Sequence, residues 1–229
     1  MEDIAERVRL LRERIARAAE RAGRDPGEII VVAATKTRTP EEISLAIEAG
    51  IKVIGENRVQ EAMAKKDRVI PGAEWHMIGH LQRNKVKRAL EIFDLIQSVD
   101  SLRLAGEIDR RARELGRTVD IFVEVNTSGE ETKFGVNPEE ALDFVARLSG
   151  MEGLRIRGLM TVGAFLPDPE DVRPCFVKLR ELSELISSQG IPGVSIDYLS
   201  MGMTNDFEIA IEEGANMVRI GTAIFGPRE

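Results

Sequence analysis

Lys36 is the residue whose type and position most clearly suggest chemistry. It follows the apolar run 29–34 and Thr35 directly, so the sequence places an amine at the end of a buried strand. Burial disfavours the charged form of an amine, and a neutral amine can attack a carbonyl group to form a Schiff base. A lysine that extends its ammonium group to solvent is the alternative, and this position alone leaves both open.

Two segments rich in glycine and hydroxyl groups favour a phosphate site. The first is 200–206, Ser-Met-Gly-Met-Thr-Asn-Asp, and the second is the pair Gly221 and Thr222. Each follows one of the last two predicted strands, where backbone N–H groups at the start of a helix and nearby hydroxyls suit a phosphate group. Ordinary helix capping by Thr204 or Asn205 would explain part of the same pattern.

Arg219 and the two histidines are further candidate functional groups. Arg219 lies inside the apolar run 217–220, where an unpaired arginine is costly, so it either forms a structural ion pair or donates into a site. His76 and His80 are four residues apart, but Gly79 interrupts the predicted strand between them. No cysteine lies nearby to complete a zinc site, so the sequence predicts no metal centre.

The elements that must position these residues alternate regularly between short apolar runs and amphipathic segments. The expected strands are 29–34, 52–54, 75–78, 95–99, 119–125, 156–161, 196–199 and 217–220. The expected helices are 2–22, 40–49, 58–68, 82–92, 102–115, 138–148, 171–187 and 205–213. Strict alternation predicts a parallel sheet, and eight units in 229 residues favour a single (β/α)8 TIM-type barrel with an extra N-terminal helix. The domain is expected to span 1–229.

Composition narrows the class of protein further. The net charge of −7 and the aromatic content of 4% argue against a nucleic-acid partner. Cys175 is the only cysteine, so no internal disulfide can form. No apolar stretch reaches the length of a membrane span, and the charged N-terminus does not resemble a signal peptide. A cytoplasmic protein without membrane contact is expected.

Six short segments, in this order, carry a resemblance to a known family. They are 32–36 (Val-Ala-Ala-Thr-Lys), 55–57 (Gly-Glu-Asn), 75–85, 159–161 (Leu-Met-Thr), 200–206 and 219–222. Together they resemble the YggS/PROSC family of pyridoxal 5′-phosphate (PLP) homeostasis proteins, which are similar to the barrel domain of alanine racemase, known as fold type III. The resemblance implies PLP bound as a Schiff base. The site residues it implies are Lys36 for the Schiff base, Ser200, Gly202, Gly221 and Thr222 for the phosphate, Arg219 facing the pyridine nitrogen, and Asn57 beside the cofactor.

Three functions are compatible with these residues: a non-catalytic PLP carrier that serves apo PLP enzymes, a PLP-dependent amino-acid racemase, and a barrel enzyme that acts on a phosphorylated metabolite through a lysine Schiff base. A racemase needs an acid or base on each face of its substrate. In alanine racemase, a tyrosine from a second, β-rich domain serves one of these faces. The sequence to Glu229 shows no counterpart of that domain, and its only tyrosine, Tyr198, is expected in mid-strand. An arginine at the pyridine nitrogen would also weaken the ring as an electron sink. The sequence therefore favours a carrier, expected to be a monomer.

Overall fold

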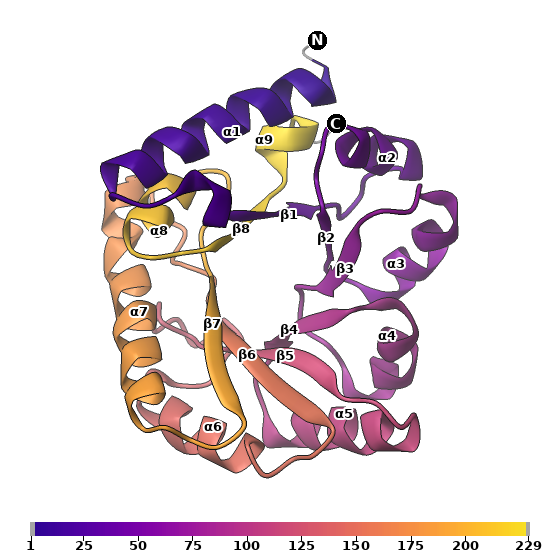
Figure 1. Cartoon of the computed structure of the whole chain (residues 1–229), viewed down its shortest axis with the longest axis vertical. Coiled ribbons are helices and arrows are strands. Elements are labelled where there is room, and N and C mark those ends of the chain that lie inside the picture. Colours follow the sequence, from indigo (N-terminus) through magenta and orange to yellow (C-terminus); the bar gives the residue numbers. More distant parts are fainter. Residues whose placement is uncertain (1–2, 228–229) are drawn as a thin grey trace.

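The structure, a computed structural model, describes residues 3–227. Within them, eight parallel strands form a closed barrel in chain order, with the helices outside it (Figure 1). This confirms the predicted (β/α)8 barrel. The strands are β1 (Ile30–Ala34), β2 (Val53–Glu56), β3 (Glu74–Met77), β4 (Leu95–Val99), β5 (Val119–Glu124), β6 (Leu154–Met160), β7 (Val194–Ser200) and β8 (Met217–Ile220).

Among the described residues, eight helices follow the expected segments closely, and a short ninth was not predicted from the sequence. They are α1 (Ile4–Arg21), α2 (Pro40–Glu48), α3 (Val59–Lys65), α4 (Val86–Ile92), α5 (Leu102–Glu114), α6 (Ala141–Leu148), α7 (Arg173–Ser188), α8 (Phe207–Glu212) and the short α9 (Thr222–Phe225). Several predicted helices are shortened because one end is a 3-10 turn, as at Lys66–Arg68, Arg83–Lys85 and Pro169–Val172. Within the described residues, no helix is both long and apolar enough to cross a membrane.

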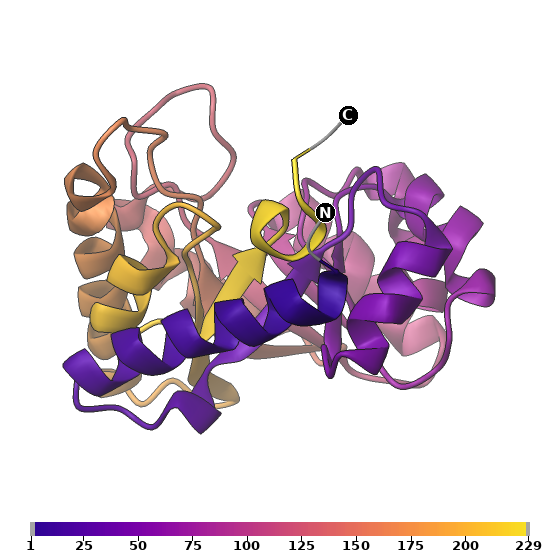
Figure 2. The ribbon, with the colours of Figure 1, turned by 90° about the horizontal axis from the view of Figure 1, so that it is seen from above.

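Local sequence explains how the first helices form. The extra N-terminal helix α1 buries Val8, Leu11 and Ile15 on one face and contacts α8 and α9, as Figure 2 also shows. At the start of α2, the Thr39 hydroxyl accepts the Glu42 N–H at 3.2 Å, and the Glu42 carboxylate accepts the Thr39 N–H at 2.8 Å. This capping box confirms the predicted start of α2.

Closure of the barrel brings its first and last strands together. Strand β1 pairs with both β2 and β8, with Val32 opposite Arg219. Strands β7 and β8 meet at one registered pair, Ser200 and Met217. Because all strands are parallel, the loops that follow β1, β7 and β8 emerge at the same rim. The segments that hold Lys36, 200–206 and 221–222 are therefore neighbours in space.

The barrel interior is apolar at its centre and polar toward this rim. Its central side chains are Val32, Val53, Leu95, Phe122, Met160 and Met217. Tyr198 packs here, with its ring centroid 5.6 Å from that of Phe122, which agrees with the packing role expected for this tyrosine. Side chains alternate along a strand, so Glu124 follows Phe122 on the inner face of β5, and Arg219 follows Met217 on that of β8. Both charged side chains are buried.

Candidate functional site

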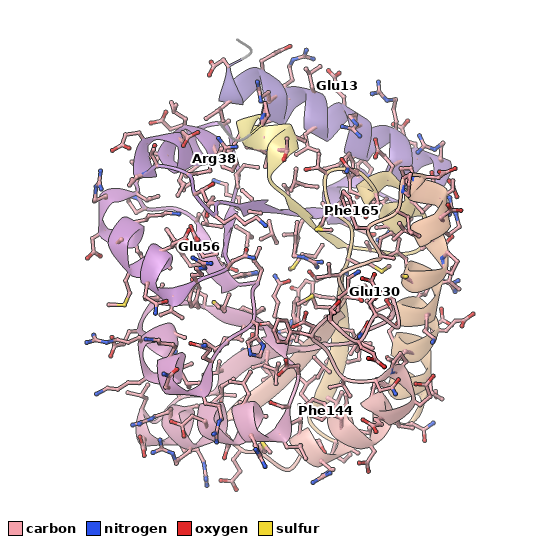
Figure 3. The ribbon with its side chains drawn as sticks, turned by 180° about the vertical axis from the view of Figure 1, so that it is seen from behind. Glu13, Arg38, Glu56, Glu130, Phe144 and Phe165 are labelled. Atoms are coloured by element: carbon pink, nitrogen blue, oxygen red, sulfur yellow. The ribbon has the colours of Figure 1, made fainter. Side chains whose placement is uncertain are left out.

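A cavity of about 290 Å³ opens at the rim between the loops after β1, β7 and β8. We call it the mouth cavity, and its volume is near the lower end of the range of roughly 300–1,000 Å³ typical of small-molecule sites. Arg38 and Phe165, labelled in Figure 3, both contribute to its wall. The residues that line it are Ala34, Lys36, Arg38, Phe165, Met203, Thr204, Asn205, Asp206, Arg219, Gly221 and Thr222.

Lys36 enters this cavity from a tight turn. The Thr35 carbonyl accepts the Arg38 N–H at 3.0 Å, which closes a four-residue turn with Lys36 at its second position. Thr37, the third residue, has a φ of 66°. The Lys36 side chain is only partly buried, so it can reach a ligand while its backbone is held at the end of β1.

The loops after β7 and β8 meet at the wall of the cavity. The Thr204 hydroxyl accepts the Ala223 N–H at 3.4 Å, which links the two loops. Gly202 has a φ of 92°, and a Cβ there would lie 2.6 Å from the Ala210 Cβ of α8, so only glycine fits. Gly221 and Thr222 begin α9. Hydroxyls and backbone N–H groups therefore gather here, as a phosphate group requires.

Arg219 forms the floor of the cavity in a fixed orientation. Only 5% of it is exposed, and one guanidinium nitrogen donates to both the carbonyl and the hydroxyl oxygen of Ser200 at 2.7 Å. The other donates to the Thr161 carbonyl at 2.6 Å. Burial lowers the pKa of Arg219 to about 10, although Glu124 and Asp206 oppose this change. The guanidinium is thus still charged at neutral pH.

Ser200 lies beneath the cavity and not in its wall. Its hydroxyl accepts from Arg219 and donates to the Gln97 amide oxygen at 2.6 Å. The Gln97 amide nitrogen in turn lies 2.9 Å from Nδ1 of His76. Contacts of Ser200 and Gly202 with a phosphate group remain predictions, because the part of this loop that lines the cavity is 203–206.

Glu124 is a buried carboxyl group close to Arg219 that the sequence analysis did not single out. Only 7% of it is exposed, and its Oε2 has no hydrogen-bond partner. Burial raises its pKa to about 7, the negative charge of Asp100 adds to this, and Arg219 acts in the opposite direction. The mouth of the barrel therefore holds a carboxyl group that titrates near neutral pH.

Asn57 and His80 lie in a second cavity, of about 660 Å³, between the loops after β2 and β3. The structure thus places Asn57 apart from the residues that line the mouth cavity. His80 stacks on Phe134 with ring centroids 3.9 Å apart, whereas His76 is buried against Gln97. Among the residues that the structure describes, no three histidine, cysteine, aspartate or glutamate side chains lie close enough together to hold a metal ion.

Four residues at or near this site were not predicted from the sequence: Arg38, Phe165, Glu124, and Asp206 in its role as a charged neighbour of Arg219. Arg38 follows Lys36 by two residues, and Asp206 ends the segment 200–206, so proximity in sequence could have indicated both. Phe165 lies on the loop after β6 and is 86% exposed, and no local pattern places it at the cavity.

The fold and this cavity define a class of protein: parallel (β/α)8 barrels with a lysine after the first strand and hydroxyl-rich loops after the last two. Comparisons with known proteins agree. The family model described as "Alanine racemase, N-terminal domain" matches residues 8–229. A pyridoxal phosphate homeostasis protein of Aquifex aeolicus is 45% identical over 225 residues, which cover 98% of each chain.

A protein of the same name from Escherichia coli K12 is 39% identical over an alignment of 234 residues, gaps included, which covers this whole chain and 98% of that one. The structure of PipY from Synechococcus elongatus with PLP bound matches with a TM-score of 0.85 and 34% identity, over 98% of this chain and 100% of that chain. The chain belongs to the alanine racemase N-terminal domain family and, within it, to the pyridoxal phosphate homeostasis proteins.

Proposed function

We propose that this protein binds PLP through a Schiff base on Lys36 and acts in intracellular PLP homeostasis and carriage. The observation that carries the proposal is that one cavity contains Lys36, the fixed guanidinium of Arg219, and the Gly221–Thr222 segment. The name of the full-length relatives and the PLP bound to PipY support it.

The residues present fit the chemical groups of PLP. The amine of Lys36 suits the aldehyde, and the hydroxyls and N–H groups around Thr204, Gly221 and Thr222 suit the phosphate. Arg219 would face the pyridine nitrogen, and Arg38, whose guanidinium is ion-paired with Glu42 at 3.2 Å, lines the wall. Ser200 and Gly202 would support the phosphate loop, and a place for Asn57 beside the cofactor is part of the same proposal.

We propose a non-catalytic role over the racemase role. Bound PLP supplies an electrophilic aldehyde and a ring that can act as an electron sink. Arg219 is charged and fixed by three hydrogen bonds, so it would disfavour protonation of the pyridine nitrogen and weaken that sink. Tyr198 packs against Phe122 inside the barrel and does not line the mouth cavity, so it is poorly placed as a second base.

An absorption spectrum of the purified protein tests the binding proposal. We expect a visible Schiff-base band that borohydride removes, and peptide mapping should then place the pyridoxyl group on Lys36. Lys36→Ala should lose the band, whereas Lys52→Ala, which changes an exposed lysine, should keep it. An unchanged band in Lys36→Ala would show that the cofactor is attached elsewhere.

The carriage proposal needs a separate experiment. We propose that the recipients are apo PLP-dependent enzymes and that the carrier is a cytoplasmic monomer. Loaded protein is mixed with an apo PLP enzyme, and recovery of that enzyme's activity is followed over time. Recovery faster than spontaneous release of PLP would support direct transfer. Recovery at the rate of spontaneous release would contradict it and leave buffering of free PLP as the role.

A further inference from the structure

We infer that three ionisable side chains on β2 and α3 are positioning residues for Lys36. Glu56, Lys65 and Glu61 form a connected set that holds the backbone on both sides of this lysine. We call this set the anchor triad. The inference rests on the proposed function of Lys36, because it assigns to the triad the task of presenting that amine to an aldehyde.

The first contact lies on the N-terminal side of Lys36. The Thr35 hydroxyl donates to Oε1 of Glu56 at 2.7 Å, and Nζ of Lys65 donates to the Thr35 carbonyl at 2.9 Å. Lys65 also donates to Oε1 of Glu56 at 2.8 Å, which closes a triangle around Thr35. Figure 3 labels Glu56. The side chain and the carbonyl group of Thr35, the residue before Lys36, are therefore both fixed.

The second contact lies on the C-terminal side. The Thr37 N–H donates to Oε2 of Glu61 at 3.2 Å, and the same carboxylate oxygen lies 3.5 Å from Nζ of Lys65. Among the described residues, Thr37 is the only one besides glycine with a positive φ, 66°. Branched side chains disfavour this conformation, and the third position of such a turn is usually glycine or asparagine. The bond from Glu61 therefore helps to hold an unfavourable backbone conformation.

Glu56 and Lys65, the two buried members of the anchor triad, are shielded from water. The side chain of Glu56 is fully buried and that of Lys65 is 11% exposed, so water cannot take the place of either partner. Burial raises the pKa of Glu56, while the hydrogen bonds from Lys65 and Thr35 oppose that change. An apolar pair of similar volume could fill this space, but it could not orient a carbonyl and a hydroxyl.

The consequence for Lys36 is geometric. With Thr35 and Thr37 held, the Cα of Lys36 has a fixed place at the rim, and its side chain starts from a defined position at the mouth cavity. Reaction rates are sensitive to such placement, because a displacement of about 1 Å can cost roughly a hundredfold. The anchor triad should therefore affect how fast Lys36 reacts more than how firmly the barrel folds.

A double-mutant cycle tests this inference. Glu61→Ala removes the acceptor of the Thr37 N–H, and Thr37→Gly allows the positive φ without cost. The rate at which PLP forms the Schiff base with apo protein is measured for wild type, both single variants and the double variant. We expect Glu61→Ala to slow the reaction roughly ten- to a hundredfold, and we expect this loss to shrink severalfold when residue 37 is glycine.

Two control variants separate positioning from stability. Glu61→Gln retains a side-chain oxygen that can accept the Thr37 N–H, so it should recover most of the rate. Glu48→Ala removes an exposed carboxylate from α2 and should leave the rate unchanged. Thermal unfolding of each variant is recorded alongside. The inference is overturned if Glu61→Ala reacts at the wild-type rate, or if its loss is the same with threonine and with glycine at residue 37.

A second readout does not depend on PLP. Trace acylation of the amines in apo protein, followed by peptide mapping, reports the reactivity of Lys36 relative to the other lysines. We expect this reactivity to change in Glu61→Ala and to return toward wild type in the double variant. A wild-type protein that never forms a Schiff base would refute the proposed function, whereas unchanged acylation of Lys36 across the cycle would refute the anchor triad.

Discussion

The buried carboxyl group of Glu124 gives a stability prediction that can be worked through in numbers. Burial is the main reason why its pKa rises from the ordinary 4.5 to about 7, and the nearby charge of Asp100 adds to the rise. Arg219 attracts the ionised form but does not cancel the cost of removing it from water. The folded protein therefore favours neutral Glu124, whereas the unfolded chain ionises it near pH 4.5.

The sign and the size of the effect follow from this difference. Between pH 4.5 and 7 the folded state keeps a proton that the unfolded state has lost, so the contribution of Glu124 to stability falls as pH rises through this window. Each pKa unit corresponds to about 1.36 kcal/mol, which gives a cost of roughly 3 kcal/mol above pH 7 and less than about 1 kcal/mol at pH 5.

Glu124→Gln should remove this cost because glutamine has the shape of the neutral carboxyl group. The free energy of unfolding of apo protein is measured in urea at pH 5 and pH 8. We expect the variant to exceed wild type by roughly 3 kcal/mol at pH 8, equivalent to a rise in Tm of roughly 6–12 °C, and by little at pH 5.

Glu131→Gln serves as the matched control, since it removes the same charge from an exposed position and should change neither value. Equal stabilisation by Glu124→Gln at both pH values would refute the reasoning, as would a loss of stability at pH 8. The first result would mean that the gain does not come from the ionisation of Glu124, and the second that its charge is compensated in the folded state.

Three further predictions concern the mouth cavity. Thr222→Ala should weaken binding of PLP several-fold and leave pyridoxal unchanged in fluorescence titrations; equal losses would place the phosphate elsewhere. Arg219→Met leaves the Ser200 and Thr161 carbonyls without their buried donor, so the free energy of unfolding should fall by roughly 3–5 kcal/mol in urea; a loss below about 1 kcal/mol would contradict this. Loaded protein should exchange the α-hydrogen of D- or L-alanine no faster than free PLP does, and turnover at roughly 1–10³ per second would restore the racemase hypothesis.

Much of the architecture could be predicted from local sequence. The apolar run 29–34 and the helix predicted from residue 40 indicate where β1 ends and α2 begins, and the structure confirms both. Helix boundaries were less accurate where a 3-10 turn continues the same residue pattern, as at Lys66–Arg68. These small errors reflect hydrogen-bond geometry, which the apolar spacing of a segment does not specify.

The barrel, the order of its units and the place of Lys36 at a strand end could all be predicted from the residues, because these features depend on apolar periodicity and capping within each segment. Which polar groups meet depends on the folded chain. Closure of β1 on β8 places Arg219 beside the loop of Lys36, while Ser200 is bound to Gln97 and Asn57 lines another cavity. Contacts between residues far apart in the chain depend on strand register and loop path, and both are settled only when whole strands pair.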